Sequence, residues 1–238
     1  MRRFVQAFSA ADFPEVLPTA VGEELSRLPA RYNISIGQTA GVLFVREQNW
    51  KIAGMSWGLV PSWETEFSTR YSTQTSRLER APRSRLFRSS WSSRRCVVPM
   101  NGYYKWDRES SPRQPYFIQA ASGEVLFAAA LWSMWGDEPG GGRLSFSILT
   151  HPNGAIPSPL VPDGPWFVPP GRIVGWIQAP ADSASRILRW EKQPRLEAYP
   201  VTRRVANRKL DEYSLLEPAD PRESSQHDPE PEDIEDDD

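Results

Sequence analysis

The feature that most constrains the fold is a series of short segments rich in β-branched and aromatic residues, separated by residues typical of turns. Residues 41–45 and 50–60 flank the polar connection "REQN", and residues 115–119 and 125–132 flank "AASGE". A further apolar run, residues 144–149, follows the glycine-rich turn "EPGGG". Such short runs with such short connections predict strands that pair mostly in sequential, antiparallel order.

Helical patterns are fewer than strand patterns in this sequence. They predict helices over residues 20–28, 78–91, 171–177 and 183–190. Pro82 interrupts the second of these, and the last begins at a potential N-cap, Asp182 or Ser183. The sequence therefore predicts an α+β domain, mainly antiparallel β, with a β-barrel-type core and a few short helices.

Composition excludes several classes of protein. The chain has 238 residues, of which 39% are hydrophobic and 24% charged, so it can bury a sizeable core. No apolar run approaches the length of a membrane span, and the first residues lack the apolar stretch of a secretory signal. One cysteine, Cys96, and two histidines, His151 and His227, leave little for a metal. We expect an intracellular protein without a metal or a cofactor.

Charge divides the chain near Leu216. The net charge is −2, but residues 217–238 hold 11 acidic residues and one basic residue, which leaves 27 basic and 19 acidic residues in 1–216. This acidic segment is rich in proline and serine and has no apolar periodicity, so we expect it to be a disordered tail. The predicted organisation is one domain over residues 1–216 followed by an acidic tail over residues 217–238.

A run of arginines lies in residues 77–95, with Phe87 and Trp91 interleaved. Its members are Arg77, Arg80, Arg83, Arg85, Arg88, Arg94 and Arg95. Basic side chains beside aromatic rings are typical of single-strand nucleic-acid binding. A solvated helix whose aromatic residues face the core explains the same pattern, and for each ring taken singly we favour this second interpretation.

The stretch "MSWGLVPSW", residues 55–63, places Trp57 and Trp63 around a glycine and a proline. A strand that runs into a rigid turn can present an indole ring to solvent. Burial in the core is the default for such rings. Because the chain has ten tryptophans, we expect some of them to line a groove.

No pattern in the sequence pairs a nucleophile with its base. Motifs such as G-x-S-x-G and the phosphate-binding P-loop are missing from it. Cys96 lies in the apolar run "CVVP" and is expected to be a buried structural thiol. His151 has no evident carboxylate partner in the sequence and is expected to be structural.

Several motifs occur together in the order and at the spacing of one known family. They are "MRRF", "ARYNISIGQ", "MSWGLVPSW", "RRCVVPMNGYYKW", "SFSILT", "GPWFVPP" and "YPVTRRVAN". Across nearly all of residues 1–216 the chain resembles the SOS-response-associated peptidase (SRAP) family. The resemblance implies a β-rich domain that binds single-stranded DNA and shields abasic sites, using a cysteine after the initiator methionine to attach covalently to the sugar aldehyde.

The positions that carry this chemistry differ in the present sequence. "MRRF" stands where the family has M-C-G-R-F; Arg2 replaces the small residue that methionine removal requires, so Met1 is expected to stay. The asparagine and the DNA-binding arginine of the family fall on Ser72 and Gln74. The acidic residue of G-x-Y-E-W is Lys105, and the histidine of H-x-R-M-P falls on Val161. The four degenerate positions Arg2, Ser72, Lys105 and Val161 predict a pseudoenzyme with no catalytic residue, because a general acid–base step needs a titratable side chain.

Nucleic-acid binding without covalent capture is the leading hypothesis, with single-stranded or damaged DNA as the partner in a DNA-damage or chromatin context. The candidate contact residues are Arg3, Trp57, Trp63, Gln74, Arg77, Arg85, Arg88 and Lys105. A cation at position 105 favours an anionic ligand such as a phosphate. A neutral Lys105 amine would also be able to form a Schiff base with an abasic aldehyde, but a solvated lysine at a vacated site is the favoured interpretation.

Two other classes of function stay open. The first is a protein-interaction module in which the former active-site groove holds a peptide, while the acidic tail engages a basic partner or masks the basic face of the domain itself. The second is an enzyme with a new activity, for which the sequence offers no constellation. The acidic tail favours the nucleus over a bacterial cytoplasm.

Overall fold

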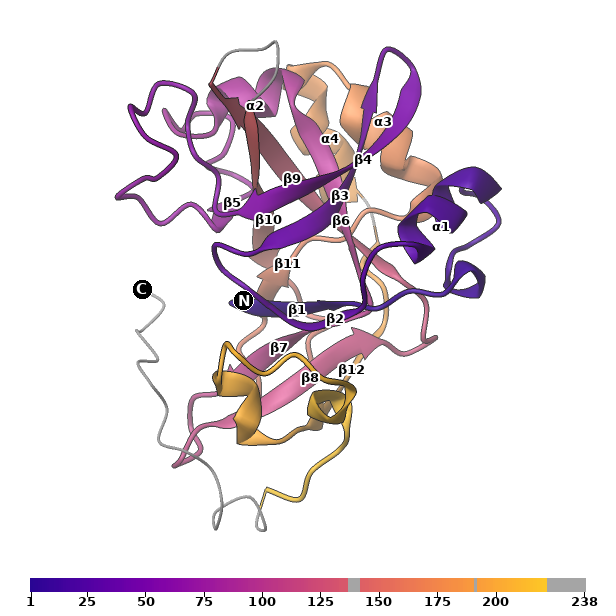
Figure 1. The fold of residues 1–238 in the computed structure, drawn as a ribbon, viewed down its shortest axis with the longest axis vertical. Coiled ribbons are helices and arrows are strands. Elements are labelled where there is room, and N and C mark those ends of the chain that lie inside the picture. The colour runs from indigo at the N-terminus through magenta and orange to yellow at the C-terminus, as the bar shows by residue number, and fades with distance from the viewer. Residues whose placement is uncertain (137–141, 191, 222–238) are drawn as a thin grey trace.

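Five strands form a closed barrel in the computed structural model, which describes residues 1–136, 142–190 and 192–221 (Figure 1). They are β3 (Thr39–Arg46), β4 (Asn49–Trp57), β6 (Arg95–Met100), β9 (Leu126–Trp135) and β10 (Arg143–Pro152). Strand β3 pairs with β4 and β6, β6 pairs with β9, and β10 pairs with both β9 and β4. The pairing thus returns to its starting strand, which leaves no open edge in this ring.

The barrel interior is filled by alternate residues of all five strands. Val42, Met55, Val98, Ala130 and Phe146 are completely buried and belong to one apolar cluster. Their period of two follows from the pleat of a strand, which sends successive side chains to opposite faces. The barrel therefore confirms the predicted β-barrel-type core.

A second sheet lies across one end of the barrel, below it in Figure 1. Its strands, in spatial order, are β12 (Leu196–Pro200), β8 (Gln114–Ala120), β7 (Gly102–Asp107), β1 (Arg3–Gln6) and β2 (Arg31–Ser35). All its pairings are antiparallel. One face contributes Phe4, Tyr103 and Ile118 to the barrel cluster. The short 3-10 helices η3 (Arg203–Ala206) and η4 (Tyr213–Leu216) supply Val205 and Leu215 to the cluster that covers the other face.

Helices cover the outside of the barrel. They are α1 (Thr19–Ser26), α2 (Arg88–Ser93), α3 (Ile173–Gln178) and α4 (Ala181–Trp190), with the 3-10 helices η1 (Ala10–Asp12) and η2 (Pro170–Arg172) beside them. Trp91, Trp176 and Leu188 pack against outward-facing barrel residues such as Leu43 and Val97. All four predicted helical regions contain a helix, but the one predicted over residues 78–91 is wrong before Arg88, because the chain around Pro82 forms turns instead.

Two pairings depart from sequential antiparallel order. Strand β10 runs parallel to β4 and to the short strand β5 (Thr75–Arg77), and antiparallel to β11 (Asp163–Pro165). Strands β4 and β5 follow each other in the chain and both run parallel to β10, so a long connection is needed between them. Residues 58–74 form this connection, a loop outside the barrel. The expectations for "EPGGG" and for a disordered tail fall mainly on residues 137–141 and 222–238, which lie outside the described residues.

Candidate nucleic-acid interface

A junction between the barrel and the second sheet contains Lys105. Its Nζ donates a hydrogen bond of 2.7 Å to the backbone oxygen of Asp163 on β11. The Asp163 carboxylate in turn pairs with the guanidinium of Arg77 on β5. One contact point therefore ties together strands β7, β11 and β5, and two of the predicted candidates, Arg77 and Lys105, meet there.

A neutral phenol lies beside this contact. Tyr103 is completely buried two residues before Lys105, and its hydroxyl has no hydrogen-bond partner among the described residues. Burial raises the pKa of the Tyr103 hydroxyl, and the nearby charge of Asp163 adds to the rise. A Cβ at Gly164 would lie 3.1 Å from the Tyr103 oxygen and 2.8 Å from Cδ1 of Ile156, so a larger residue here would displace these side chains.

The first strand brings the start of the chain to the same junction. Strand β1 pairs Arg3 with Tyr104 and Phe4 with Tyr103, so Arg2 runs on in the direction of Lys105. Met1 packs against the barrel cluster.

The Arg3 guanidinium is held by its own chain. It donates a hydrogen bond of 3.2 Å to Oδ1 of Asn33 and another to the backbone oxygen of Ala206. Burial, followed by repulsion from Arg208, lowers the pKa of Arg3 to about 10. Arg3 is charged at neutral pH, but its guanidinium N–H groups donate hydrogen bonds to Asn33 and Ala206, which stabilise the fold.

The two candidates before β5 contact each other. The Ser72 hydroxyl donates a hydrogen bond of 3.1 Å to the side chain of Gln74, and Ser72 is exposed. Val161, at 43% exposure, lies on the loop that enters β11, where its backbone oxygen accepts a hydrogen bond of 2.8 Å from Asp163 N–H. These side chains offer one hydroxyl, one amide and one isopropyl group, and none of them titrates near neutral pH.

Trp57 is a candidate that the structure corrects. Its ring is completely buried, packs edge-on against Phe4 at 4.9 Å and lies parallel to Phe146 at 6.4 Å. Its Nε1 donates a hydrogen bond of 2.8 Å to the backbone oxygen of Gln74. Trp57 therefore anchors β5 to the barrel and offers no face to a base.

The arginine run of residues 77–95 separates into three groups. Arg95 is 3% exposed and donates to the backbone oxygens of Trp91, Trp176 and Ile177, among others, which secures α2 and α3 to the barrel. Phe87 and Trp91 are core residues, as the favoured interpretation has it. Arg77 pairs with Asp163, as described above. The other five members have no ion pair with any carboxylate of the described residues; they are Arg80, Arg83, Arg85, Arg88 and Arg94.

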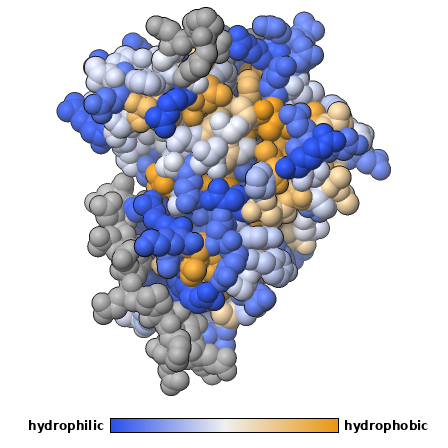
Figure 2. Space-filling view, viewed as in Figure 1, coloured by the Kyte–Doolittle hydropathy of each residue, from blue (hydrophilic) through white to orange (hydrophobic). Residues whose placement is uncertain are grey.

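Aromatic residues of the 58–74 loop lie beside arginines. Trp63, 46% exposed, has the Arg85 guanidinium 6.0 Å from its ring centre. Phe67 has Arg143 at 3.7 Å and Tyr71, 42% exposed, has Arg70 at 5.2 Å. In the view of Figure 2 the loops beside β5 are mostly hydrophilic, with a few hydrophobic residues among them. Exposed rings flanked by cations are the combination that stacks bases and contacts phosphates.

The sequence predicted only part of this arrangement. It singled out Trp63 and Arg85, but it missed Phe67, Tyr71 and Arg143. Arg143 begins β10, which is far from the loop in sequence and next to β4 only through a parallel pairing. The signal that could have identified Phe67 and Tyr71 is that two aromatic residues occur within a long connection between strands.

His151 also has a partner that the sequence did not reveal. Its Nδ1 contacts the carboxylate of Glu79, and its ring packs edge-on against Trp166 at 4.8 Å. The parallel pairing of β5 with β10 places Arg77 beside Thr150, which brings Glu79 to His151. The statement that this histidine lacks a carboxylate partner is wrong, and the pair lies on the face of β10 that packs toward the helices.

The one cysteine of the sequence lies inside the barrel, away from the junction. Cys96 is completely buried inside the barrel, and burial raises the pKa of its thiol well above the usual value. Within residues 1–136, 142–190 and 192–221, no group of three or more His, Cys, Asp or Glu side chains is placed to hold a metal ion. In the same ranges no helix has the length and apolar character needed to cross a bilayer.

Comparison with known proteins gives one consistent picture. A family model described as "SOS response associated peptidase (SRAP)" matches residues 2–208. The abasic site processing protein YedK of Escherichia coli is 28% identical over 134 residues, which cover 55% of this chain and 59% of that protein. The abasic site processing protein HMCES of Xenopus tropicalis is 31% identical over 121 residues, covering 42% and 36%. The matched regions thus span less than two thirds of these relatives.

Two solved structures share the fold. A protein from Bacteroides thetaiotaomicron has a TM-score of 0.71 at 18% identity, with 91% of this chain and 99% of that one covered. A phage-related protein from Bordetella bronchiseptica has a TM-score of 0.65 at 24% identity, covering 84% and 94%. At these identities the likeness establishes the architecture alone, and it confirms the predicted fold class.

Proposed function

The chain belongs to the SOS response associated peptidase family, and from this premise we propose that it binds single-stranded or damaged DNA without forming a covalent bond to it. Relatives of this chain carry the name abasic site processing protein, which makes DNA with abasic sites the reference substrate. The proposal keeps the substrate class of those relatives and removes the capture step. Its chromatin setting stays a prediction from the acidic segment 217–238.

The observation that carries the proposal is the set of exposed rings on the 58–74 loop with arginines beside them. Trp63 and Tyr71 each expose more than two fifths of their surface, so both rings are accessible to a base. Arg85 and Arg70 lie over these rings and hold positive charge where a phosphate would follow a stacked base. Stacking on an aromatic ring contributes about 1–3 kcal/mol per base and tolerates any sequence.

Loss of the covalent step is supported by the chemistry at the junction. Lys105 stands where the motif G-x-Y-E-W has its acidic residue, and its Nζ is hydrogen-bonded to a backbone oxygen. Val161 stands where the motif H-x-R-M-P has its histidine. The only thiol in the sequence, Cys96, is enclosed in the barrel and kept protonated by burial. A reaction at an abasic aldehyde needs an accessible nucleophile and a titratable group in reach of it. Cys96 is enclosed and Val161 does not titrate, which leaves only the Lys105 amine among these three residues, and that amine donates a hydrogen bond to the backbone oxygen of Asp163.

Fluorescence anisotropy of a labelled single-stranded oligonucleotide, titrated with the full chain at several salt concentrations, tests the binding. We expect the logarithm of the binding constant to fall linearly with the logarithm of the salt concentration, by about 0.7 per phosphate contacted. Arg46, exposed on the β3–β4 hairpin beside Glu47, offers a matched control. Arg46→Gln should bind as the parent does, whereas Arg85→Gln should bind more weakly. No binding by the parent at low salt would refute the proposal.

A further inference from the structure

We propose that Trp135 is a positioning residue of the candidate interface. It holds the middle of the 58–74 loop against the barrel and thereby fixes the two exposed rings, Trp63 and Tyr71, in the arrangement that a nucleic acid contacts. The hold on the loop depends only on contacts among the described residues, whereas its consequence for binding rests on the proposed function. Trp135 is half-buried at the end of β9, and the motifs of the sequence did not single it out.

The 58–74 loop needs contacts of its own to be ordered. It is long and contains no helix or strand, and a connection of more than about 12–15 residues without secondary structure is uncommon in a folded domain. Val60 N–H donates a hydrogen bond of 2.8 Å to the hydroxyl of Ser145, and Leu59 N–H donates one of 3.3 Å to the backbone oxygen of Thr73. These bonds fix the two ends of the loop, so the exposed rings between them must be held by other contacts.

Trp135 contacts the middle of the loop in two ways. Its Nε1 donates a hydrogen bond of 2.8 Å to the backbone oxygen of Glu64. Its ring packs edge-on against Phe67, with the ring centres 5.9 Å apart, and the Arg143 guanidinium lies 3.7 Å from the centre of the same Phe67 ring. Arg143 and Trp135 are paired across β10 and β9. Directly paired side chains project from one face of a sheet, so the two residues reach the loop together.

Glu64 connects this contact to the two exposed rings. Its backbone N–H donates a hydrogen bond of 3.2 Å to the Pro61 oxygen, which closes a turn that contains Trp63. Its carboxylate accepts a hydrogen bond of 3.3 Å from the Thr69 hydroxyl, whose oxygen accepts another of 3.3 Å from the backbone N–H of Tyr71. Because these bonds are long, they order the loop only while Glu64 itself is fixed. The arrangement of both rings therefore depends on the residue that the indole N–H holds.

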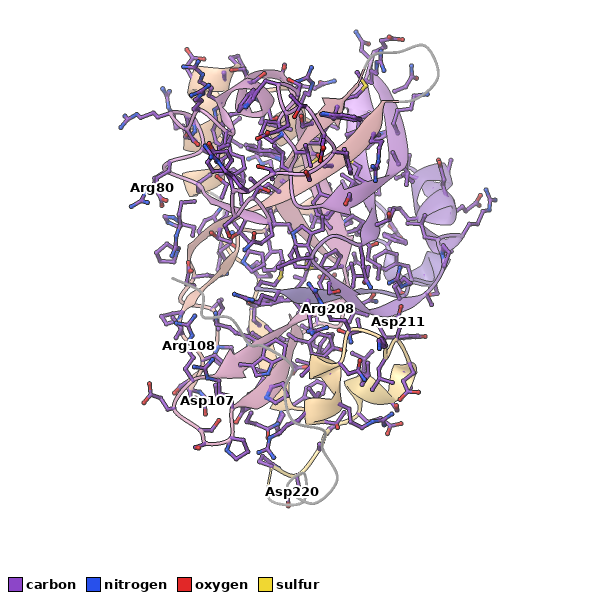
Figure 3. All side chains as sticks on the ribbon, turned by 60° about the vertical axis from the view of Figure 1, so that its left-hand side comes forward. Arg80, Asp107, Arg108, Arg208, Asp211 and Asp220 are labelled. Atoms are coloured by element: carbon purple, nitrogen blue, oxygen red, sulfur yellow. The ribbon has the colours of Figure 1, made fainter. Side chains whose placement is uncertain are left out.

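This contact lies far from the junction of Lys105 with Asp163. The junction lies beside Pro152, the last residue of β10, whereas Trp135 pairs with the first residue of that strand. The ten residues of β10 separate the two places by about 30 Å. In Figure 3 Arg108, which follows β7 of the junction, lies in the lower half of the molecule, and the barrel occupies the upper half. Trp135 thus acts on the stacking surface and not on the junction.

A loop that is already held in its binding conformation makes association faster. When only a fraction of the molecules has its rings in place, the apparent dissociation constant rises by the inverse of that fraction. Direct contacts with a ligand act mainly on its release instead. Loss of the Trp135 N–H should therefore lower the association rate constant, whereas loss of a stacking ring should raise the dissociation rate constant.

Hydrogen exchange of the free full chain, followed by mass spectrometry, tests the hold on the loop. Trp135→Phe keeps a ring beside Phe67 but removes the N–H that the Glu64 oxygen accepts. We expect peptides from residues 58–74 to exchange about tenfold faster in this variant, as the loss of one net hydrogen bond allows. Peptides from the β3–β4 hairpin should exchange as they do in the parent.

Trp176→Phe is the matched control. Trp176 is completely buried on the side of the barrel that the helices cover, and its Nε1 donates a hydrogen bond of 2.9 Å to the backbone oxygen of Cys96. The variant loses the same kind of bond away from the loop, so the 58–74 peptides should exchange as in the parent. Parent-like exchange of the loop in folded Trp135→Phe, or an equal increase in Trp176→Phe, would overturn the inference.

A second variant removes the contact from the loop side. Phe67→Leu leaves the strands unchanged and takes away the ring that Trp135 and Arg143 contact. It should also exchange faster over residues 58–74. If Trp135→Phe does not fold, this variant decides the question, and parent-like exchange in it would overturn the inference.

Stopped-flow binding of a labelled single-stranded oligonucleotide at low salt tests the consequence for the interface. We expect Trp135→Phe to lower the association rate constant about tenfold and to leave the dissociation rate constant as in the parent. The dependence on salt should stay the same, because no phosphate contact is removed. Trp63→Ala should instead raise the dissociation rate constant, and Trp176→Phe should bind as the parent does.

The two arms give distinct outcomes. Faster exchange of the loop in Trp135→Phe, with no nucleic-acid binding by the parent, would uphold the hold on the loop and refute the proposed function. Binding by the parent, with unchanged loop exchange in Trp135→Phe, would uphold the function and refute the inference. Faster exchange with both rate constants unchanged would refute the positioning role.

Discussion

The barrel and the 58–74 loop both contain arginine or tryptophan contacts, but these residues are buried in the barrel and exposed at the loop. In the barrel, Arg95 donates its hydrogen bonds to backbone oxygens. Trp57 packs among other rings, and its Nε1 donates a hydrogen bond to the backbone oxygen of Gln74. On the loop, Trp63 is 46% exposed and has the guanidinium of Arg85, from the 78–87 turns, 6.0 Å from its ring centre. Arginine and tryptophan therefore predict neither stability nor binding by themselves, and the hydrogen-bond partners and the exposure of each side chain decide which role it has.

Arg95→Met should produce the largest effect that separates the two regions. The change leaves several buried backbone oxygens without their charged donor, each of which costs about 1–3 kcal/mol, so we expect the free energy of unfolding to fall by about 3 kcal/mol or more. Its neighbour Arg94 lies 5.8 Å from the Trp132 ring centre and has no carboxylate partner in the described residues. Arg94→Met should cost about 1 kcal/mol or less.

Urea denaturation of the two variants and the parent measures this difference. The midpoint should fall strongly for Arg95→Met, with little change for Arg94→Met. Equal losses would mean that Arg95 is not the residue that secures α2 and α3 to the barrel.

Trp63→Ala should give the next largest effect, and on affinity rather than stability. The loss of one stacking platform should weaken binding to a single-stranded oligonucleotide about tenfold, with the urea midpoint nearly unchanged. Tyr213, 64% exposed on η4 on the far side of the second sheet, is the matched control. Tyr213→Ala should bind as the parent does, and an equal loss in both variants would argue against a defined interface on the loop.

Arg85→Gln should have a smaller and more specific effect. Removal of one phosphate contact should reduce the slope of log affinity against log salt by about 0.7. The measurement is the anisotropy titration at four or five salt concentrations. A parallel shift of the line with an unchanged slope would mean that Arg85 supports the Trp63 ring and does not contact the phosphates.

Cys96 should give the smallest effect at neutral pH. Because burial raises the pKa of the folded thiol, the folded protein holds this proton while the unfolded chain releases it. The contribution to the free energy of unfolding should therefore fall as pH rises above the usual thiol pKa of about 8.5. Cys96→Ser should remove this part of the pH dependence. Reaction of the native thiol with an aromatic disulfide reagent at pH 8 would contradict its burial.

Local patterns in the sequence predicted most of the fold. Residues 41–45 and 50–60 alternate or cluster apolar side chains around a polar turn, and they form the hairpin of β3 and β4 in register. The closure of the barrel could not be predicted from them, because it depends on the parallel contact of Ser145 with Ser56, which are remote in sequence. The helix predicted over residues 78–91 failed where Pro82 and the close approach of the 78–87 turns to the core outweighed helical spacing.

The candidate site was predicted less completely. Arg77 and Lys105 were identified from charge and from motif positions, but their meeting at Asp163 depends on β11, a strand of three residues without a recognisable pattern. Exposure decided between Trp57 and Trp63, which the sequence could not distinguish within "MSWGLVPSW". The positions of the site residues thus depend on pairing between strands that are remote in sequence, whereas the strands themselves are predicted by local residue patterns.

Binding without capture is the central claim, and one experiment addresses both halves of it. The full chain is incubated with a labelled single-stranded oligonucleotide that carries one abasic site, and each sample is divided between a native and a denaturing gel. We predict a shifted band on the native gel and an unshifted band on the denaturing gel. A shifted band under denaturing conditions would show that covalent chemistry survives, through Lys105 or another residue, and would contradict the account.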